Sequence, residues 1–217
     1  MLKSLYPLIN WDIIRIAGFD LDGTLYDEMD FIMQVYKPIS DILAKLCNSS
    51  PEQISGLMSQ RWLMKGSSYD LIFAEVLSNH GINGAAAEAA VTECLAVYRG
   101  YKPQMCLPPR VSFIMDYMKN NYDLFLISDG NSSLQMEKFT VLGLARWISS
   151  YNVGFTGLYG LDFAKPSIKI IDKISALQQC KLPESVVYFG DRDIDKQFAA
   201  AAGFQFVSVQ GLISSTK

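Results

Sequence analysis

Acidic residues follow two apolar stretches of this sequence. Asp20 and Asp22 come directly after "IIRIAGF", and Asp191 follows "SVVYFG", with Asp195 four residues later. If these stretches are parallel strands, their carboxyl ends meet at the edge of the sheet where ligands of such folds bind. Four carboxylates gathered there would repel one another and raise one another's pKa. A divalent cation would relieve that repulsion, and oxygen donors without His or Cys favour Mg²⁺ over zinc.

Two further groups suit an anion. Ser128 ends the apolar stretch "YDLFLIS", so that a hydroxyl and free backbone N–H groups occur at a strand-to-helix turn. Lys165 precedes Pro166, which favours an extended backbone. Each has a simpler interpretation, Ser128 as a helix N-cap and Lys165 as a surface lysine. Together, Mg²⁺ and Lys165 would accept a phosphate dianion that the carboxylates alone would repel.

This set of groups predicts phosphoryl chemistry. One carboxylate attacks phosphorus in line while the cation and hydrogen-bond donors stabilise the spread charge. The other gives a proton to the leaving group and later takes one from water. The alternatives are solvated loop acids at Asp20 and Asp22, and favourable helix-dipole placement for Asp191 and Asp195. Asp193 could take the place of Asp195 if the turn after Gly190 is irregular.

Five apolar stretches are the elements that must position these groups. Each lies near a helical pattern, which predicts an α/β sheet wound with crossover helices. A core helix is expected over "RVSFIMDYMKNN" (110–121). The expected strands are 13–19, 122–128, 147–153, 185–190 and 204–209.

The segment 27–105 has a different character, because it is helical nearly throughout. "SPEQ", beginning at Ser50, is a capping box with proline at the first helical position. Ser67 and Asn83 are expected to cap two further helices, and we expect four helices in all. The prediction is therefore a Rossmann-like parallel sheet core formed by 1–26 and 106–217, with a helical cap domain, 27–105, inserted after the first strand.

Composition narrows the class of protein. Of 217 residues, 50% are hydrophobic, which is enough for a sizeable core, and 19% are charged. The net charge of −3 comes without any basic block, so no nucleic-acid partner is expected. The N-terminus does not resemble a signal peptide, and no apolar run reaches the ~18 residues of a membrane span. We expect a cytoplasmic protein without a membrane partner, either a monomer or a homodimer.

The four cysteines are scattered through the sequence, at 47, 94, 106 and 180. No CxxC pair is present, so neither a disulfide framework nor a zinc site is expected. We interpret them as buried free thiols in a reducing compartment.

Four motifs occur in a characteristic order, and "DLDGT" is the most specific of them. With them, the sequence resembles the haloacid dehalogenase (HAD) superfamily of phosphohydrolases from Asp20 to Gly203. The resemblance implies a HAD-like fold with a helical cap between the first two motifs. Dehalogenases of this superfamily lack an aspartate at the place of Asp22, so its presence favours phosphate chemistry. The motifs are "DLDGT" (20–24), "ISDG" (127–130), Lys165-Pro166 and "GDRDID" (190–195).

The resemblance also implies a role for each group. Asp20 would be the nucleophile that forms an aspartyl-phosphate, and Asp22 the general acid and base. Ser128, the backbone of Asp129 and the ammonium of Lys165 would bind the phosphate. The second motif often reads Thr/Ser-Asn, so the Asp129 side chain is expected to point away from the anion. The metal site would consist of Asp20, Asp22 through its backbone carbonyl, and Asp191 as a direct Mg²⁺ ligand. Asp195 would support this site through water or hydrogen bonds.

The expected function is Mg²⁺-dependent hydrolysis of a small phosphorylated metabolite, a phosphomonoester, through an aspartyl-phosphate. A phosphotransferase or sugar-phosphate mutase on the same scaffold is the enzymatic alternative, and a receiver-like phospho-accepting module is the non-enzymatic one. The cap would determine the substrate, because the core recognises mainly phosphate. Arg61, Trp62 and Lys65 are possible substrate contacts, or else a solvated helix face with a packed tryptophan.

Overall fold

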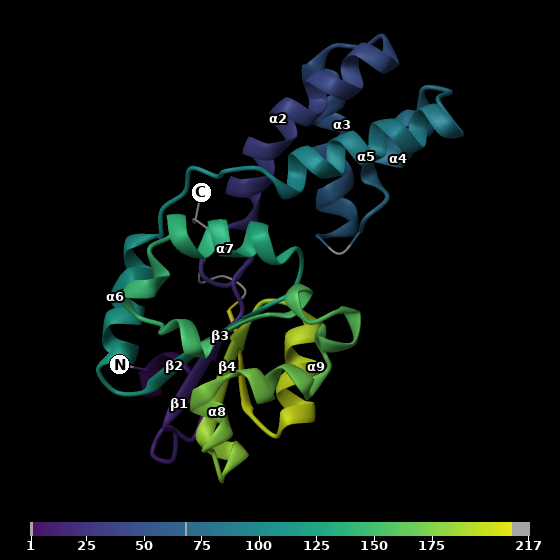
Figure 1. Cartoon of the computed structure of the whole chain (residues 1–217). Helices are drawn as coiled ribbons and strands as arrows, with labels where there is room; N and C mark the ends of the chain where they lie inside the picture. Colours follow the sequence, from purple (N-terminus) through teal and green to yellow (C-terminus); the bar gives the residue numbers. More distant parts are fainter. Residues whose placement is uncertain (1, 68, 210–217) are drawn as a thin grey trace. The chain divides into compact units, whose positions relative to one another are not determined.

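The chain divides into two compact units. The computed structural model describes residues 2–67 and 69–209 (Figure 1). One unit, which we call the core unit, comprises 1–28 and 104–217, and the other, the helical unit, comprises 29–103. The expected domain boundaries fell at 26/27 and 105/106, two residues or fewer from these.

The core unit is built on a five-stranded parallel sheet with the order β3-β2-β1-β4-β5. This confirms the expected α/β fold. The expected strand at 147–153 is wrong, because residues 147–149 follow a 3-10 turn (Leu144–Arg146), residues 150–152 form a second one, and pairing begins only at Val153. A short apolar run does not by itself distinguish a strand from other buried structure. The strands are β1 (Ile16–Phe19), β2 (Asp123–Ser128), β3 (Val153–Phe155), β4 (Val186–Gly190) and β5 (Gln205–Ser208).

β1 is the central strand, and this decides which loops meet. Phe19, its last residue, pairs with Leu126 of β2 on one side and Phe189 of β4 on the other. The chain builds outward from β1 to β2 and β3, and then returns to add β4 and β5 on the opposite side. Such a reversal of strand order leaves a crevice at the carboxyl ends of the strands. The loops after β1, β2 and β4 therefore begin side by side.

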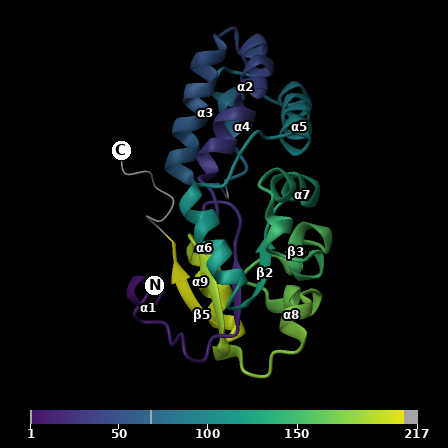
Figure 2. The same ribbon diagram turned by 90° about the vertical axis from the view of Figure 1, so that its left-hand side faces the viewer.

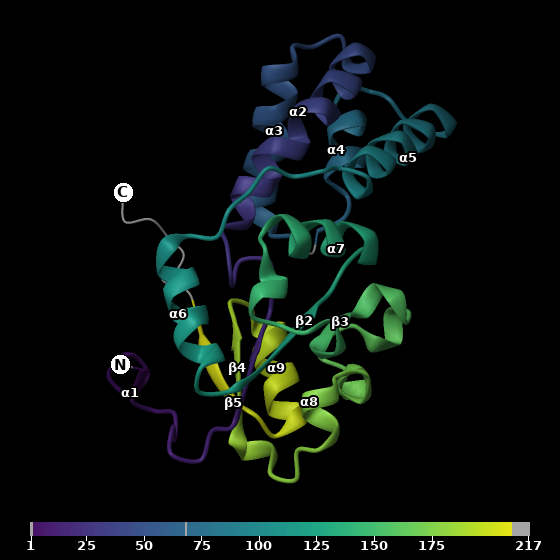
Figure 3. The same cartoon turned by 60° about the vertical axis from the view of Figure 1, so that its left-hand side comes forward.

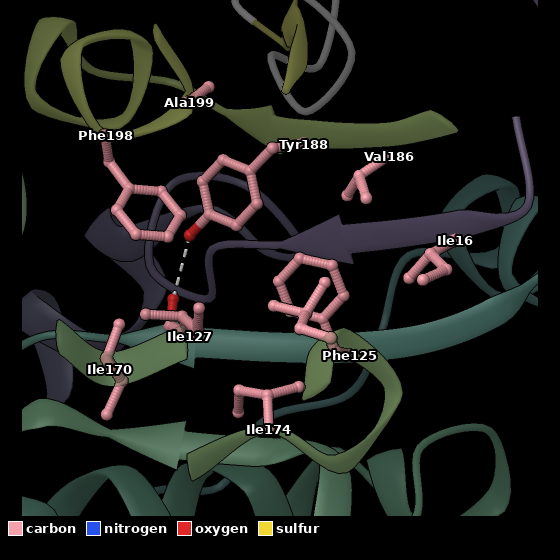
Figure 4. Close-up of a cluster of buried hydrophobic side chains, with 10 residues drawn as sticks. Ile16, Phe125, Ile127, Ile170, Ile174, Val186, Tyr188, Phe198 and Ala199 are labelled. Carbon is pink, nitrogen blue, oxygen red and sulfur yellow. Dashed lines mark hydrogen bonds between the residues drawn. The ribbon is translucent and has the colours of Figure 1, made fainter. Parts of the chain in front are cut away.

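Both faces of the sheet are covered, so its strands are apolar on both sides. One face packs Phe125, Ile127 and Tyr188 against α9 (Asp193–Ala202) and the segment of α8 (Ser175–Gln178). The Tyr188 hydroxyl donates a hydrogen bond to the Ile127 carbonyl at 3.1 Å, inside this cluster (Figure 4). A polar group is thus satisfied in an otherwise apolar layer, close below the carboxyl ends of the strands.

The other face is covered by α6 (Pro109–Lys119) and by the N-terminal segment with α1 (Leu2–Leu5). In Figure 3, α6 lies on one side of the strands and α8 and α9 lie on the other. The N-terminal segment runs beside the edge strand β5 (Figure 2). It is tied to that strand because the Asn10 backbone N–H donates to the Gln205 side chain at 2.8 Å. α7 (Ser132–Val141) follows β2 and packs beside β3.

The described residues of the helical unit form four helices, which is the expected number. The capping box at Ser50 is confirmed, because its hydroxyl accepts from the Gln53 N–H and the Gln53 side chain accepts from the Ser50 N–H. The expected caps Ser67 and Asn83 are wrong: Leu71 and Gly84 hold those positions, without a side-chain hydrogen bond. The helices are α2 (Glu28–Cys47), α3 (Pro51–Lys65), α4 (Ile72–Asn79) and α5 (Ala85–Arg99).

Two sequence expectations concern the whole chain. Among the described residues, no helix is both long enough and apolar enough to cross a membrane. The cysteines are free thiols, as expected, but only Cys47 and Cys94 are buried; Cys106 is exposed and Cys180 is half-buried. The expectation of four buried thiols is therefore wrong for two of them.

Candidate active site at the strand ends

The ammonium of Lys165 lies between two buried carboxylates. Its Nζ is 2.5 Å from Asp20 Oδ1 and 2.5 Å from Asp195 Oδ1. Lys165 is only 5% exposed, so its interpretation as a surface lysine is wrong. Tyr188, on β4, supports it from within the sheet, with its hydroxyl 3.5 Å from Nζ.

One cation shared by two carboxylates leaves excess negative charge, and the pKa values reflect this. Burial, with Asp195 nearby, raises the pKa of Asp20 to about 7 although Lys165 lowers it. Burial acts against the charged form of Lys165, but Asp20, Tyr188 and Asp195 raise its pKa well above the ordinary value. The ammonium therefore stays charged, while Asp20 readily takes up a proton when no other cation is bound.

Asp191 completes a cluster of three acids. One carboxylate oxygen from each of Asp20, Asp191 and Asp195 lies within 4.8 Å of the others. Burial and Asp195 raise the pKa of Asp191 as well. Hard oxygen donors with surplus negative charge are the set that a divalent cation such as Mg²⁺ requires, so these residues fit the expected metal. The cluster is thus a candidate metal site.

Asp191 lies close to the loop after β1 because that loop has a glycine, Gly23, at the point of contact. Gly23 has φ +75°, and a Cβ there would lie 2.4 Å from Asp191 Oδ2. The neighbouring Thr24 hydroxyl donates to Asp191 Oδ1 at 3.3 Å and lies 3.5 Å from Asp20 Oδ2. The loops after β1 and β4 therefore touch at the point where the acids gather.

Asp195 rather than Asp193 belongs to the cluster. Asp195 is fully buried in the first turn of α9, where its second oxygen accepts from the Arg192 backbone N–H at 3.2 Å. Asp193 is exposed and is not part of the cluster. The difference follows from helical periodicity, because residues two apart on a helix point in different directions.

The turn after β2 carries Ser128 and Asp129. Ser128 is 1% exposed at the end of its strand, and the N-cap of α7 is Asn131, so Ser128 is not the cap. The Asp129 carboxylate accepts from the Thr156 hydroxyl at 2.8 Å and from the Lys165 backbone N–H at 3.2 Å. These contacts hold the Asp129 side chain on the loops that follow β3.

Asp22 is held by groups that the sequence analysis missed. Lys138 Nζ lies 2.6 Å from Asp22 Oδ1, and Gln135 Nε2 lies 2.6 Å from Oδ2. The Tyr26 hydroxyl also donates to Oδ1. Burial alone would raise the pKa of Asp22, but Lys138, Tyr26 and Gln135 together lower it below its ordinary value.

A signal for Lys138 and Gln135 was present in the sequence. In "SLQMEKF", both fall on the helical stripe that also carries Leu134 and Phe139, and all four are buried. Polar residues on the apolar face of an amphipathic helix are uncommon without a partner. That stripe could have identified both residues before the structure was known.

Two of the three possible substrate contacts, Arg61 and Lys65, have partners within the helical unit. Arg61 makes a two-pronged ion pair with Glu75, which also accepts from the Tyr69 hydroxyl. Lys65 is exposed and lies over the ring of Tyr69, 5.6 Å from its centroid. Trp62 lines a cavity of about 170 Å³, and its indole N–H is buried without a partner among the described residues. Of the three, Trp62 alone lines this cavity.

A protein-family model described as haloacid dehalogenase-like hydrolase matches residues 14–203. A curated relative, the glyceraldehyde 3-phosphate phosphatase of Methanothermobacter thermautotrophicus, is 24% identical over 212 residues, covering 94% of this chain and 89% of its own.

Solved structures with a similar fold include a HAD-superfamily hydrolase of subfamily IA, variant 1, from Geobacter sulfurreducens. It has a TM-score of 0.67 and 19% identity over 90% of this chain and 87% of its own. A 2-haloacid dehalogenase from Pseudomonas syringae has a TM-score of 0.56 and 21% identity, over 94% of this chain and 90% of its own.

Proposed function

Since the chain belongs to the haloacid dehalogenase-like hydrolases, we propose that it is a Mg²⁺-dependent phosphohydrolase of small phosphomonoesters that works through an aspartyl-phosphate at Asp20. The observation that carries the proposal is the buried cluster in which Lys165 joins Asp20 to Asp195, with Asp191 alongside. A cluster of this charge favours a metal cation and, with it, a phosphate dianion.

Asp22 favours phosphate over halide chemistry. A halide leaves as an anion and needs no proton, whereas the alkoxide released from a phosphomonoester does. A carboxylate held two residues after the proposed nucleophile supplies such a proton. The 24% identical relative, which is named a phosphatase, supports the same choice.

The reaction divides into two displacements. An oxygen of Asp20 forms a bond to phosphorus, the bond to the leaving oxygen breaks, and that oxygen takes a proton from Asp22, whose protonated form the adjacent phosphate dianion favours. Water then attacks phosphorus as Asp22 takes back a proton, and the bond to Asp20 breaks to release phosphate. Lys165 keeps Asp20 oriented, and Ser128 with the Asp129 backbone would donate to the phosphoryl oxygens.

The metal would be held by Asp20, Asp191 and Asp195, with the backbone carbonyl of Asp22. When bound, Mg²⁺ supplies positive charge that offsets the charge on the transferring phosphoryl group. A mutase or phosphotransferase would use the same first displacement and pass the phosphoryl group to another hydroxyl. A receiver-like module would form the same phosphoaspartate but would keep it for minutes.

The test is phosphate release from 4-nitrophenyl phosphate with Mg²⁺, with and without EDTA. Wild type is expected to turn over, EDTA to abolish turnover, and Asp20→Asn to lower it by at least about 10³-fold, because the nucleophile is lost. Equal activity in Asp20→Asn and wild type would contradict the mechanism. Isomer formation from a hexose 1-phosphate without free phosphate would favour a mutase, and a phosphoenzyme stable for minutes a receiver-like module.

A further inference from the structure

Both oxygens of the Asp22 carboxylate accept hydrogen bonds from side chains of one helix, α7. Lys138 and Gln135 lie three residues apart on α7, so both face the same direction. Lys138 Nζ reaches one carboxylate oxygen and Gln135 Nε2 the other, each at 2.6 Å. Two contacts from a single rigid element fix both the place and the tilt of a carboxylate, which one contact alone does not.

The burial of Lys138 shows that this contact is specific. Its side chain is 3% exposed and that of Asp22 is 12% exposed. An ammonium is placed out of water only at considerable cost unless a carboxylate accepts it. Lys138 also lies over the ring of Tyr26, with Nζ 5.9 Å from its centroid. The buried side chain of Lys138 therefore ends at the Asp22 carboxylate and not in solvent.

Gln135 connects Asp22 to the turn after β2. Its Nε2 also donates to the Asp129 carbonyl oxygen at 2.6 Å. The same amide group therefore contacts the loop after β1, through Asp22, and the loop after β2. A displacement of Gln135 would therefore remove hydrogen bonds to both loops.

We infer that Lys138, assisted by Gln135, is a positioning residue that holds the Asp22 carboxylate where it exchanges protons with the leaving group and with water. The inference rests on the proposed phosphohydrolase function. Proton transfer requires hydrogen-bond distance in the reacting complex, and a misplacement of about 1 Å can cost on the order of 10²-fold in rate. The effect of Lys138 is therefore expected in the proton-transfer steps and not in substrate binding.

The test is the Lys138→Met variant, which keeps the length of the apolar stem and removes the ammonium. Steady-state rates are compared over aryl phosphates from 4-nitrophenyl to phenyl to 4-methoxyphenyl, at saturating Mg²⁺. We expect kcat/KM, which reports transfer of the phosphoryl group to Asp20, to fall by about 10²-fold for the poorer leaving groups. The loss should be smaller for transfer from 4-nitrophenyl phosphate, because nitrophenolate leaves without a proton.

A second readout isolates the hydrolytic half. If Asp22 is misplaced, water attack on the phosphoenzyme slows while its formation from 4-nitrophenyl phosphate does not. Rapid mixing of Lys138→Met should therefore give a burst of one nitrophenolate per active site, followed by slow turnover. A merely structural role of Lys138 would change neither the dependence on leaving group nor the burst.

The controls separate this inference from folding and from the proposed function. Lys169→Ala removes an exposed lysine of the core unit, paired with Asp162, and should match wild type. Lys138→Arg should recover part of the lost kcat. If near-UV circular dichroism shows that Lys138→Met does not fold, Gln135→Leu takes its place. It should show the same dependence on leaving group and the same burst, with a loss of activity of about tenfold.

Each outcome has one meaning. Wild-type activity in folded Lys138→Met, an equal loss of kcat/KM across the phosphate series, or an unchanged kcat without a burst would overturn the inference and leave the phosphohydrolase function intact. A rise in kcat would also overturn it, because Lys138 would then restrain Asp22 away from its working position. Failure of wild type to release phosphate from every aryl phosphate would overturn both.

Discussion

At the residue scale, the site holds more acid than its cations balance. Asp20 and Asp195 share one ammonium, and burial raises the pKa of Asp20 to about 7. In the unfolded chain an aspartate has a pKa near 3.8. The folded state therefore binds the proton more tightly than the unfolded state. The stability that this difference contributes is fully present below pH 3.8 and is lost as pH rises through about 7.

Asp20→Asn should consequently stabilise the metal-free protein at high pH. At pH 8 we expect a gain on the order of 1–3 kcal/mol, because the variant no longer buries an ionised Asp20. At pH 5 the gain should shrink, since the wild-type carboxyl is then mostly protonated. Thermal unfolding in EDTA at both pH values measures the difference between the two proteins. A gain that is independent of pH would show that Asp20 is not the titrating group.

At the element scale, the position of Asp191 depends on the loop after β1. Gly23 has a positive φ and leaves no room for a Cβ, which would lie 2.4 Å from Asp191 Oδ2. An alanine there must either strain the backbone or push the carboxylate away. The acid cluster would lose its geometry even though no acidic residue had changed.

Gly23→Ala is therefore expected to weaken Mg²⁺ binding by at least about tenfold, through displacement of Asp191. Isothermal titration calorimetry with MgCl₂ measures the affinity directly. The matched control is Gly143→Ala, in the same unit, which has φ +65° and nothing within 4 Å of its Cβ position. It should lose stability through backbone strain but keep its affinity for Mg²⁺. Equal loss of affinity in both variants would rule out the steric explanation.

The residues at the strand ends could be predicted from the sequence, but the contribution of α7, which contacts Asp22, could not. β1, β2 and β4 were recognisable because buried parallel strands are short, apolar runs that end in polar turns. β3 was misplaced, because Trp147 and Ile148 are buried just after the 3-10 turn Leu144–Arg146 and not in a strand. The local pattern could have marked Lys138 as a buried polar residue but could not identify its partner, Asp22, which lies 116 residues away in sequence. A contact of that kind depends on the topology and not on local pattern.

At the scale of the whole molecule, the two units contain acids whose contributions to stability depend on pH in opposite directions. In the helical unit, Arg61 and then Tyr69 lower the pKa of Glu75 to about 2, whereas the unfolded value is near 4.5. A depressed pKa means that the folded state favours the ionised form. The stability from this group is therefore present above pH 4.5 and is lost as pH falls through about 2.

Glu75→Gln should remove this pH dependence and leave the helical unit less stable at pH 7. Trp62 is the tryptophan of this unit, so its fluorescence reports unfolding there once Trp11 and Trp147 are replaced by Phe. Urea unfolding at pH 7 and pH 3 should show a smaller pH effect in Glu75→Gln than in its parent. Asp162→Asn, which alters an ion pair of the core unit, should leave the Trp62 transition unchanged. Equal pH effects in Glu75→Gln and its parent would exclude Glu75 as the source.

The anchoring of Asp22 by Tyr26 has a consequence for how such proteins diversify. The Tyr26 hydroxyl binds Asp22 just before the chain enters the helical unit, and every group named in the catalytic proposal comes from 1–28 or 104–217. Under the proposed function, we therefore expect that the segment 29–103 can be exchanged while the chemical steps stay the same. A chimera carrying the helical segment of another family member should inherit that donor's choice of substrate. Its phosphoenzyme should still be hydrolysed at the rate of the recipient core.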